Sequence, residues 1–312
     1  MRPIIKPLFL LLAILAIHFQ AKAQTCSGSL GDPIISQTFG SGANPGAPLG
    51  ASTTYLYSDT QCPNDGSYTV ANSTSGCFGS VWHTLTQDHT GNPNGYMMLV
   101  NASVAPGIFY TQTASAGELC PNTTYEFAAY ILNLIKKSAC GGATIQPNIT
   151  FNIKTKDGVI LKQYNTGDIP ATDAPVWDKK YGTYFTTPAE PVDVIVEMVN
   201  NAPGGCGNDI ALDDITFRAC GPVVQAGFGD LSSTGAQDIC QGTSASYTLT
   251  SSVGAGYTNP FLQWQLNYNN TGWTNITGQT STVLNLKFAS SVVPGSYQYR
   301  LAVGEGQNIA SP

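Results

Sequence analysis

The sequence predicts an all-β protein, and three observations lead to that prediction. Short segments rich in Val, Ile, Thr, Tyr and Phe recur at intervals of about ten residues, separated by clusters of Gly, Pro, Asn and Asp. No segment holds the apolar period of an amphipathic helix. The chain of 312 residues is long enough for about two domains. We expect a two-sheet antiparallel β-sandwich of jelly-roll type over residues 24–221 and a second, partial β-sandwich over residues 222–312.

The first unit accounts for most of the expected strands. Asp157-Gly158 suits a tight hairpin between two of them. A boundary is expected near residue 222, where the composition shifts to Gly, Ser, Thr and Gln. The expected strands of the first unit are 34–39, 53–57, 68–70, 96–100, 108–112, 124–132, 148–154, 159–164, 180–186, 192–199 and 210–218. Those of the second unit are 244–250, 261–266, 283–286 and 297–303.

Residues 1–23 have the features of a secretory signal peptide. Arg2 and Lys6 precede an apolar run, and Ala21-Lys22-Ala23 is a small-residue cleavage signal before Gln24. No other run approaches the roughly 18 apolar residues of a membrane helix. We therefore expect an exported, extracellular protein that is associated with the cell surface and has no transmembrane segment in this chain.

The charge of the chain argues against one class of partner. The formal net charge is −6, and removal of residues 1–23 takes away three basic residues and no acidic ones. A nucleic-acid-binding surface needs the opposite balance, because it must neutralise phosphates. No nucleic-acid partner is expected.

All eight cysteines follow the cleavage signal, so they enter an oxidising compartment and disulfides are expected. No C-x-x-C occurs, which leaves zinc and redox motifs without support. Cys120 begins a strand and competes with Cys26 for Cys220, so the connectivity of Cys120 and of Cys240 stays open. The pairs expected from the positions of the strands are Cys26 with Cys220, Cys62 with Cys77, and Cys140 with Cys206.

The stretch from Gly204 to Cys220 alternates apolar and polar residues and reads as the closing strand of the first unit. Asp213 and Asp214 are adjacent in it and are expected to point to opposite faces of the strand. Ionised carboxylates resist burial without a partner, so a bound cation or backbone N–H groups must compensate them. The two explanations are given equal weight. The expected ligands of a structural calcium ion are Asp213 first, with Asp32, Asp209 and Asp88 as companions.

Two signatures in the first unit resemble those of MAM domains, which are extracellular adhesion modules of jelly-roll fold. The first is Asp88-His89-Thr90-Gly91 followed by the run at 95–100, and the second is the run from Asp209 to Phe217 with Cys220 after it. The sequence lacks the second His of the family's first signature and has more cysteines. Related galactose-binding-like and carbohydrate-binding jelly rolls also end on a strand whose Asp holds a structural calcium. The resemblance implies an adhesive or ligand-binding module.

The second unit resembles an immunoglobulin-like domain, with Trp264 as its core tryptophan and Tyr297 or Tyr299 near the tyrosine-corner position. Its final strand would lie beyond Pro312, so further modules are expected there. Together with the signal peptide, this layout resembles the N-terminal part of large secreted surface proteins of Bacteroidota. Such proteins are substrates of type IX secretion and carry gliding-motility-associated modules.

Catalytic signatures are absent from the sequence. His83 and His89 are the histidines that follow the signal peptide, and neither stands in a Gly-x-Ser-x-Gly, His-Glu-x-x-His or P-loop motif. Glutamates that could serve a glycosidase are equally explained as solvent-facing strand residues. These are Glu118, Glu126, Glu190 and Glu197. We expect a protein that is not an enzyme.

Aromatic residues are the expected ligand contacts, because flat rings stack on the apolar faces of sugars while nearby polar groups bond the hydroxyls. The candidates are Trp177 and Tyr181, followed by Trp82 and Tyr96, although Trp82 fits a packed core residue better. The expected function is adhesion or polysaccharide binding through the jelly roll. The alternatives are a structural stalk that spaces other modules of a large surface protein, and a carbohydrate-active enzyme.

Overall fold

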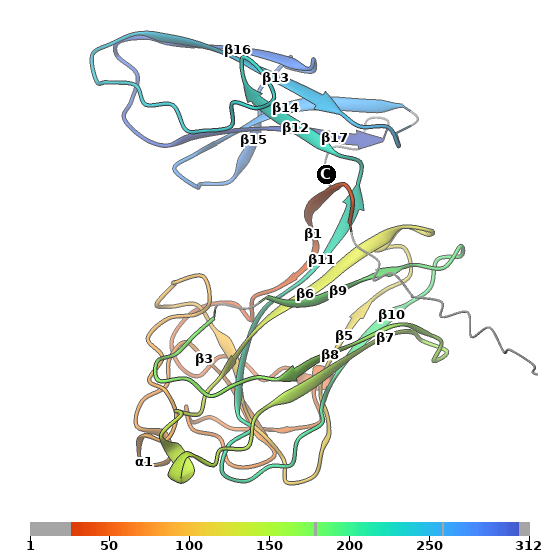
Figure 1. Ribbon diagram of the computed structural model, residues 1–312, viewed down its shortest axis with the longest axis vertical. Coiled ribbons are helices and arrows are strands. Elements are labelled where there is room, and N and C mark those ends of the chain that lie inside the picture. Colours follow the sequence, from red (N-terminus) through yellow and green to blue (C-terminus); the bar gives the residue numbers. More distant parts are fainter. Residues whose placement is uncertain (1–25, 178–179, 258, 306–312) are drawn as a thin grey trace, which may run out of the picture.

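The computed structural model describes residues 26–177, 180–257 and 259–305, and their regular secondary structure is almost entirely β-strand (Figure 1). A jelly-roll β-sandwich is followed by a smaller β-sandwich, so the predicted fold class is confirmed. The expected signal peptide and residues 306–312 lie outside the described residues. None of the helices in the described part of the chain has the length and apolar character needed to cross a lipid bilayer.

The larger sheet of the first sandwich is built around its closing strand, β11 (Ile210–Gly221). One edge of β11 pairs with β6 (Thr124–Asn133), which pairs with β9 (Lys180–Thr186). The other edge is shared, because β4 (Met97–Asn101) pairs with its first residues and β1 (Ser29–Gln37) pairs with its last. The sheet continues from β4 to β3 (Ser67–Ala71) and β2 (Leu56–Tyr57).

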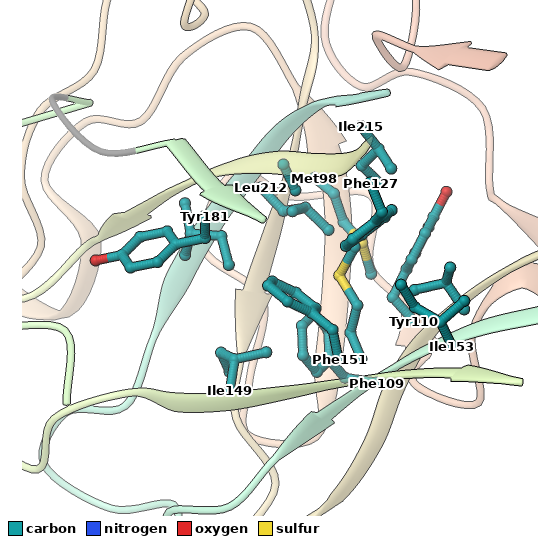
Figure 2. Close-up of a cluster of buried hydrophobic side chains, with 14 of the residues drawn as sticks. Met98, Phe109, Tyr110, Phe127, Ile149, Phe151, Ile153, Tyr181, Leu212 and Ile215 are labelled. Carbon is teal, nitrogen blue, oxygen red and sulfur yellow. The ribbon is translucent and has the colours of Figure 1, made fainter. Parts of the chain in front are cut away.

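The second sheet of this sandwich has four antiparallel strands in the order β5 (Gly107–Ala114), β10 (Val194–Asn200), β7 (Asn148–Thr155) and β8 (Ile160–Asp168). Burial alternates residue by residue along β7 and β10, as a half-buried strand requires. The buried side chains, such as Phe151 and Met198, meet those of β6 and β11 in one apolar core (Figure 2).

Loops cover the outer face of the seven-stranded sheet. Met97, Leu99 and Ala211 point away from the main core and pack against loop residues such as Trp82 and Ile135 in a second apolar cluster. Every residue of β4 is therefore buried, on both faces of the strand. The loops contain only short helical turns, which are η1 (Gly50–Ser52), α1 (Cys77–Ser80) and η2 (Ala139–Gly142).

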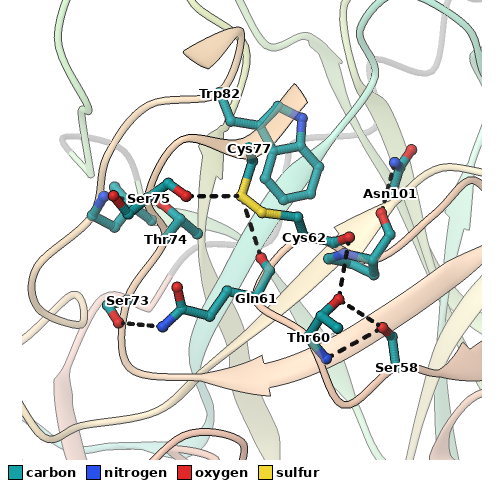
Figure 3. The surroundings of a disulfide bond; sticks show 12 residues. Ser58, Thr60, Gln61, Cys62, Ser73, Thr74, Ser75, Cys77, Trp82 and Asn101 are labelled. Atoms are coloured by element: carbon teal, nitrogen blue, oxygen red, sulfur yellow. Dashed lines mark hydrogen bonds between the residues drawn. A yellow bond between two sulfur atoms is a disulfide. The ribbon is translucent and has the colours of Figure 1, made fainter. Parts of the chain in front are cut away.

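Three disulfides close the first sandwich, and they are the three pairs expected from the sequence. Cys26–Cys220 joins the start of β1 to the end of β11, and Cys140–Cys206 joins two loops. Cys62–Cys77 lies in the second cluster beside Trp82 (Figure 3). Cys120 and Cys240 are exposed free thiols.

The smaller sandwich begins with β12, two residues after β11 ends. One sheet holds β12 (Val224–Phe228), β13 (Ala245–Val253) and β16 (Val283–Phe288), and the other holds β15 (Trp273–Asn275), β14 (Pro260–Tyr268) and β17 (Tyr297–Glu305). Strands β12 and β15 were not expected from the sequence. Trp264 on β14 is fully buried at the centre of this core, and its indole N–H donates to the Ser281 carbonyl at 2.9 Å.

Candidate functional site

The acidic pair of the closing strand lies at a β-bulge. Asp213 pairs with Tyr130 and Thr216 with Ala128, so Asp214 and Ile215 together oppose a single residue of β6. Asp214 has a φ of 45°, in the left-handed region. The extra residue keeps Ile215 in the core and brings both carboxylates to the same residue, His89. The expectation that the two aspartates point to opposite faces is therefore wrong, because it assumed a regular strand.

His89 is held by contacts on several sides. Its backbone N–H donates to Asp213 Oδ2 at 3.2 Å, and its ring Nδ1 lies 2.6 Å from Asp214 Oδ2. The ring stacks on Tyr130, with centroids 3.4 Å apart and planes inclined by 22°. Trp177 meets it edge-on at 5.8 Å. A residue from a loop is thus fixed against two strands of the sheet.

The loop that carries His89 is shaped by the buried carboxylate of Asp88. Its Oδ1 accepts hydrogen bonds from the Thr90 hydroxyl at 2.7 Å and from the Asn92 N–H at 2.9 Å. Gly95 packs directly against this carboxylate, since an added Cβ would lie 1.7 Å from Asp88 Oδ2. The Asp-His-Thr-Gly signature therefore has a structural meaning: Asp88 closes the loop, and the His89 ring packs against Tyr130 and Asp214 of the sheet.

We name His89, Tyr130, Trp177 and Asp214 the aromatic–acid patch. All four are half-buried, with the side chains of His89 and Asp214 exposed by 21% and 17%. Asp213 lies beneath them and is only 1% exposed. Burial, followed by the negative charge of Asp214, raises the pKa of Asp213 to about 8.

The patch offers groups for recognition rather than an activated nucleophile. Two aromatic rings, a carboxylate acceptor and an imidazole lie side by side with part of their surface open to solvent. The Thr90 hydroxyl, next in the chain, donates to Asp88 and not to the imidazole. Thr90 therefore does not supply the His89–Asp214 pair with the nucleophile that a hydrolytic triad requires.

Three of the four expected ligand-contacting aromatics are buried instead. Trp82 is 1% exposed, Tyr181 is 6% exposed and Tyr96 is 9% exposed. The Trp82 indole N–H donates to Asp209, and Tyr181 belongs to the main core (Figure 2). Their expected role in ligand contact is corrected, because rings covered by loops and by the second sheet cannot stack on a sugar. Trp177 remains as the partly exposed candidate.

The four carboxylates expected around calcium are not gathered at one place. Asp32 is bound by Arg300. Asp209 accepts from Trp82 at 2.9 Å and from the Ala102 N–H at 3.3 Å, and burial raises its pKa to about 7. Within the described residues no group of three or more His, Cys, Asp or Glu is arranged to hold a metal ion. Calcium binding by Asp213 and Asp88 stays a prediction.

Sequence reasoning did not assign Tyr130 or Asp214 to a site. Asp214 was visible as part of an acidic doublet, but its contact with His89 joins positions 125 residues apart. Tyr130 carries no signal of its own, since it stands in an ordinary strand and gains its role by pairing with Asp213, next to the bulge.

Comparisons with known proteins give little beyond the fold. A family model described as a domain of unknown function (DUF8696) matches residues 230–311, which hold strands β13 to β17. No curated protein matches the chain.

Solved structures that share the fold are distant. A Stig cyclase, Fisc, from Fischerella sp. TAU is 13% identical over 61% of this chain and 84% of its own, with a TM-score of 0.36. The CBM22-1 xylan-binding domain of Paenibacillus barcinonensis Xyn10C is 12% identical over 62% of this chain and 98% of its own, with a TM-score of 0.33. The CBM22-1–CBM22-2 tandem of Xyn10C is 12% identical over 91% of this chain and 93% of its own, with a TM-score of 0.32. Likenesses this weak carry no information on ligand or reaction.

Proposed function

We propose that this protein binds carbohydrate through the aromatic–acid patch of its jelly-roll domain. The observation that carries the proposal is the His89–Asp214 contact of 2.6 Å, held beside the half-buried rings of Tyr130 and Trp177. Aromatic rings stack on the apolar faces of pyranoses, and a carboxylate and an imidazole bond the ring hydroxyls.

Contacts within the chain hold the side chains of the patch in place, which supports a binding role for it. Asp213 fixes the backbone of His89, Asp214 fixes its ring, and Tyr130 lies on a strand of the seven-stranded sheet. A site whose side chains are already ordered loses less conformational entropy on binding.

We place this binding activity outside the cell, on a modular protein of domains 24–221 and 222–312. Three disulfides support an oxidising, extracellular environment. The ligand is a polysaccharide or another cell-surface glycan, and the role is adhesion to it. The signal peptide, the Bacteroidota type IX layout and the modules beyond Pro312 belong to the same proposal.

Glycan arrays and affinity electrophoresis of the mature chain in gels with soluble polysaccharides test the proposal. Trp177→Ala removes the stacking ring, and we expect affinity to fall about tenfold or more, since an aromatic contact contributes roughly 1–2 kcal/mol. Trp273→Ala is the matched control, because Trp273 is an exposed tryptophan of β15, in the other sandwich. Equal affinity of the wild type and Trp177→Ala contradicts the patch as the site.

One observation favours the alternative of a structural stalk. The two sandwiches are joined by Pro222 and Val223 between strands, by the Arg300–Asp32 ion pair and by hydrogen bonds between Ser29 and Val224. Such a joint holds modules in a defined orientation, as a spacer needs. A wild-type chain that retains no glycan, yet keeps a fixed shape in small-angle scattering, would favour the stalk.

A further inference from the structure

A groove of about 820 Å³ lies in the second sandwich, far from every residue that the sequence singled out for ligand contact. It is about four times the size of the 210 Å³ recess where the two sandwiches meet. Its volume lies within the range of small-ligand sites, roughly 300–1,000 Å³. The groove runs between strands β12, β13 and β16, the start of β17 and the loops at 234–239 and 292–296.

One wall of the groove is a row of aromatic rings. Phe228 contacts Tyr247 with centroids 5.6 Å apart, Tyr247 contacts Phe288 at 6.2 Å, and Phe288 contacts Tyr297 at 5.6 Å. All four are half-buried, whereas Trp264 in the core of the same sandwich is 0% exposed. Phe228 also packs against the core of this sandwich, so the row of rings lies where that core meets the groove.

The rim supplies hydrogen-bonding groups and almost no charge. Its polar side chains are solvent-exposed, and among all residues that line the groove only Asp238 has a carboxylate and none is Lys or Arg. A phosphorylated, sulfated or carboxylated ligand would find no cation there, so a neutral ligand with many hydroxyls fits the charge of the groove. The polar rim residues are Thr234, Gln237, Asp238, Ser296 and Gln298.

The loop that forms one side of the groove is tied down by tyrosine hydroxyls. Tyr297 donates to the Val293 carbonyl at 2.8 Å, and Tyr268 donates to the Pro294 carbonyl at 2.9 Å. Gly295 packs so closely that an added Cβ would lie 2.5 Å from the Tyr268 ring. The loop beside the aromatic wall is thus held in place by contacts within the chain.

We propose that this groove is a second carbohydrate-binding site, specific for neutral polysaccharide. The choice of ligand class rests on the proposed function of the first sandwich, while the site itself rests on the aromatic wall, the uncharged rim and the volume. Two sites on one chain hold a polysaccharide more tightly than either alone, because the second contact forms at high effective concentration.

Calorimetric titration of the mature chain with a short neutral oligosaccharide tests the number of sites. We expect two sites per chain for the wild type and one for Gln237→Ala/Asp238→Ala, which removes two exposed rim side chains without touching the core. Tyr247→Ala removes part of the aromatic wall and is expected to lower the affinity of the groove for the oligosaccharide about tenfold. Trp264 fluorescence reports whether that variant remains folded.

The matched control is Asn285→Ala/Lys287→Ala, which truncates two exposed side chains of β16 that do not line the groove. It should keep both sites. Trp177→Ala separates this inference from the proposed function. If this variant loses the site at the aromatic–acid patch and keeps the site in the groove, both proposals are supported. If Trp177→Ala abolishes all binding while the rim and wall variants bind as the wild type does, the groove proposal is wrong. If only the rim and wall variants lose binding, the groove is supported as a binding site and the aromatic–acid patch is contradicted as one.

Discussion

Arg300 on β17 binds the carboxylate of Asp32 on β1 with both of its terminal nitrogens, each 2.7 Å from a carboxylate oxygen. Its Nε donates to Gln265 at 2.7 Å, and its guanidinium lies 4.4 Å from the centre of the Trp273 ring. A planar guanidinium suits this paired geometry. Arg300 of the second sandwich thus contacts the first sandwich directly. Asp32, which was expected to bind calcium, forms an ion pair with the neighbouring domain instead.

Arg300→Ala should loosen the joint between the sandwiches. The side chains of Arg300 and Asp32 are 25% and 46% exposed, so the loss in the free energy of unfolding should be about 1 kcal/mol or less. The orientation of the domains should change more than the stability, because the Ser29–Val224 hydrogen bonds that remain lie next to the linker. We expect a broader distance distribution in small-angle X-ray scattering and an altered Trp273 emission. Lys287→Ala, also in the second sandwich, serves as control, and an unchanged scattering curve for Arg300→Ala would mean that the linker and the Ser29–Val224 contacts set the orientation.

The Cys26–Cys220 disulfide should stabilise the first sandwich more than Cys62–Cys77 does. The two bonds close loops with sequence separations of 194 and 15 residues. Loop-closure entropy alone predicts contributions of about 5 and about 3 kcal/mol. Replacing each pair by alanine and measuring denaturant unfolding tests the order. A larger loss for the Cys62–Cys77 pair would show that local packing beside Trp82 outweighs the entropy of the unfolded chain.

The sequence predicted strands well where a regular pattern decides the structure. Residues 148–154 alternate polar and apolar side chains, and the strand β7 begins at the predicted residue. It predicted the aromatic site less well, because the exposure of a ring depends on which loop covers it. Trp82 and Trp177 both stand in loops, and only the chain packed above them makes the first buried and the second accessible.

The bulge at Asp214 could not be predicted for a related reason. Alternation assigned Asp213 and Asp214 to opposite faces, and one extra residue changes that assignment. The groove of the second sandwich escaped notice because its aromatic residues look like ordinary core positions in the sequence. In the structure these rings are half-buried and line the groove.

The first sandwich should lose stability as the pH rises from about 6.5 to 8. Burial raises the pKa of Asp209 to about 7 and of Asp213 to about 8, above the 3.8 of a free Asp. The folded state therefore binds more protons than the unfolded state in this window, so the free energy of unfolding falls with pH. Below pH 6.5 His83 opposes this trend, because burial lowers its pKa.

Thermal melts across this pH range measure the effect. A fall of about 1 kcal/mol in the free energy of unfolding lowers Tm by roughly 2–4 °C in a domain of this size. Asp213→Asn should flatten the dependence, even if the loss of a hydrogen-bond acceptor lowers Tm at every pH. A midpoint that rises between pH 6.5 and 8 would contradict the assignment.

Substitutions of Asp214 should separate its backbone role from its side-chain role. Asp214→Val places a β-branched residue at a φ of 45° and should cost about 1–2 kcal/mol. Asp214→Gly accepts that conformation but loses the contact with His89. Asp214→Asn keeps both. We expect thermal stability to fall most for Val, and glycan affinity to fall for Val and Gly but not for Asn. Equal affinity of Gly and Asn would show that the acid does not position His89 for binding.

Gly95→Ala should disrupt the patch without changing any residue in it. An alanine Cβ would lie 1.7 Å from Asp88 Oδ2 and 2.5 Å from its Cγ, so the carboxylate must move. Its hydrogen bonds from Thr90 and Asn92 then break, at a cost of about 2 kcal/mol for two bonds. His89 lies between Asp88 and Thr90 in the chain and should lose its fixed position against Tyr130. We expect a lower Tm and weaker glycan binding, whereas Gly107→Ala, which meets no atom within 4 Å, should behave as the wild type. Full glycan affinity in a Gly95→Ala protein with a lowered Tm would show that the Asp88 loop serves stability alone.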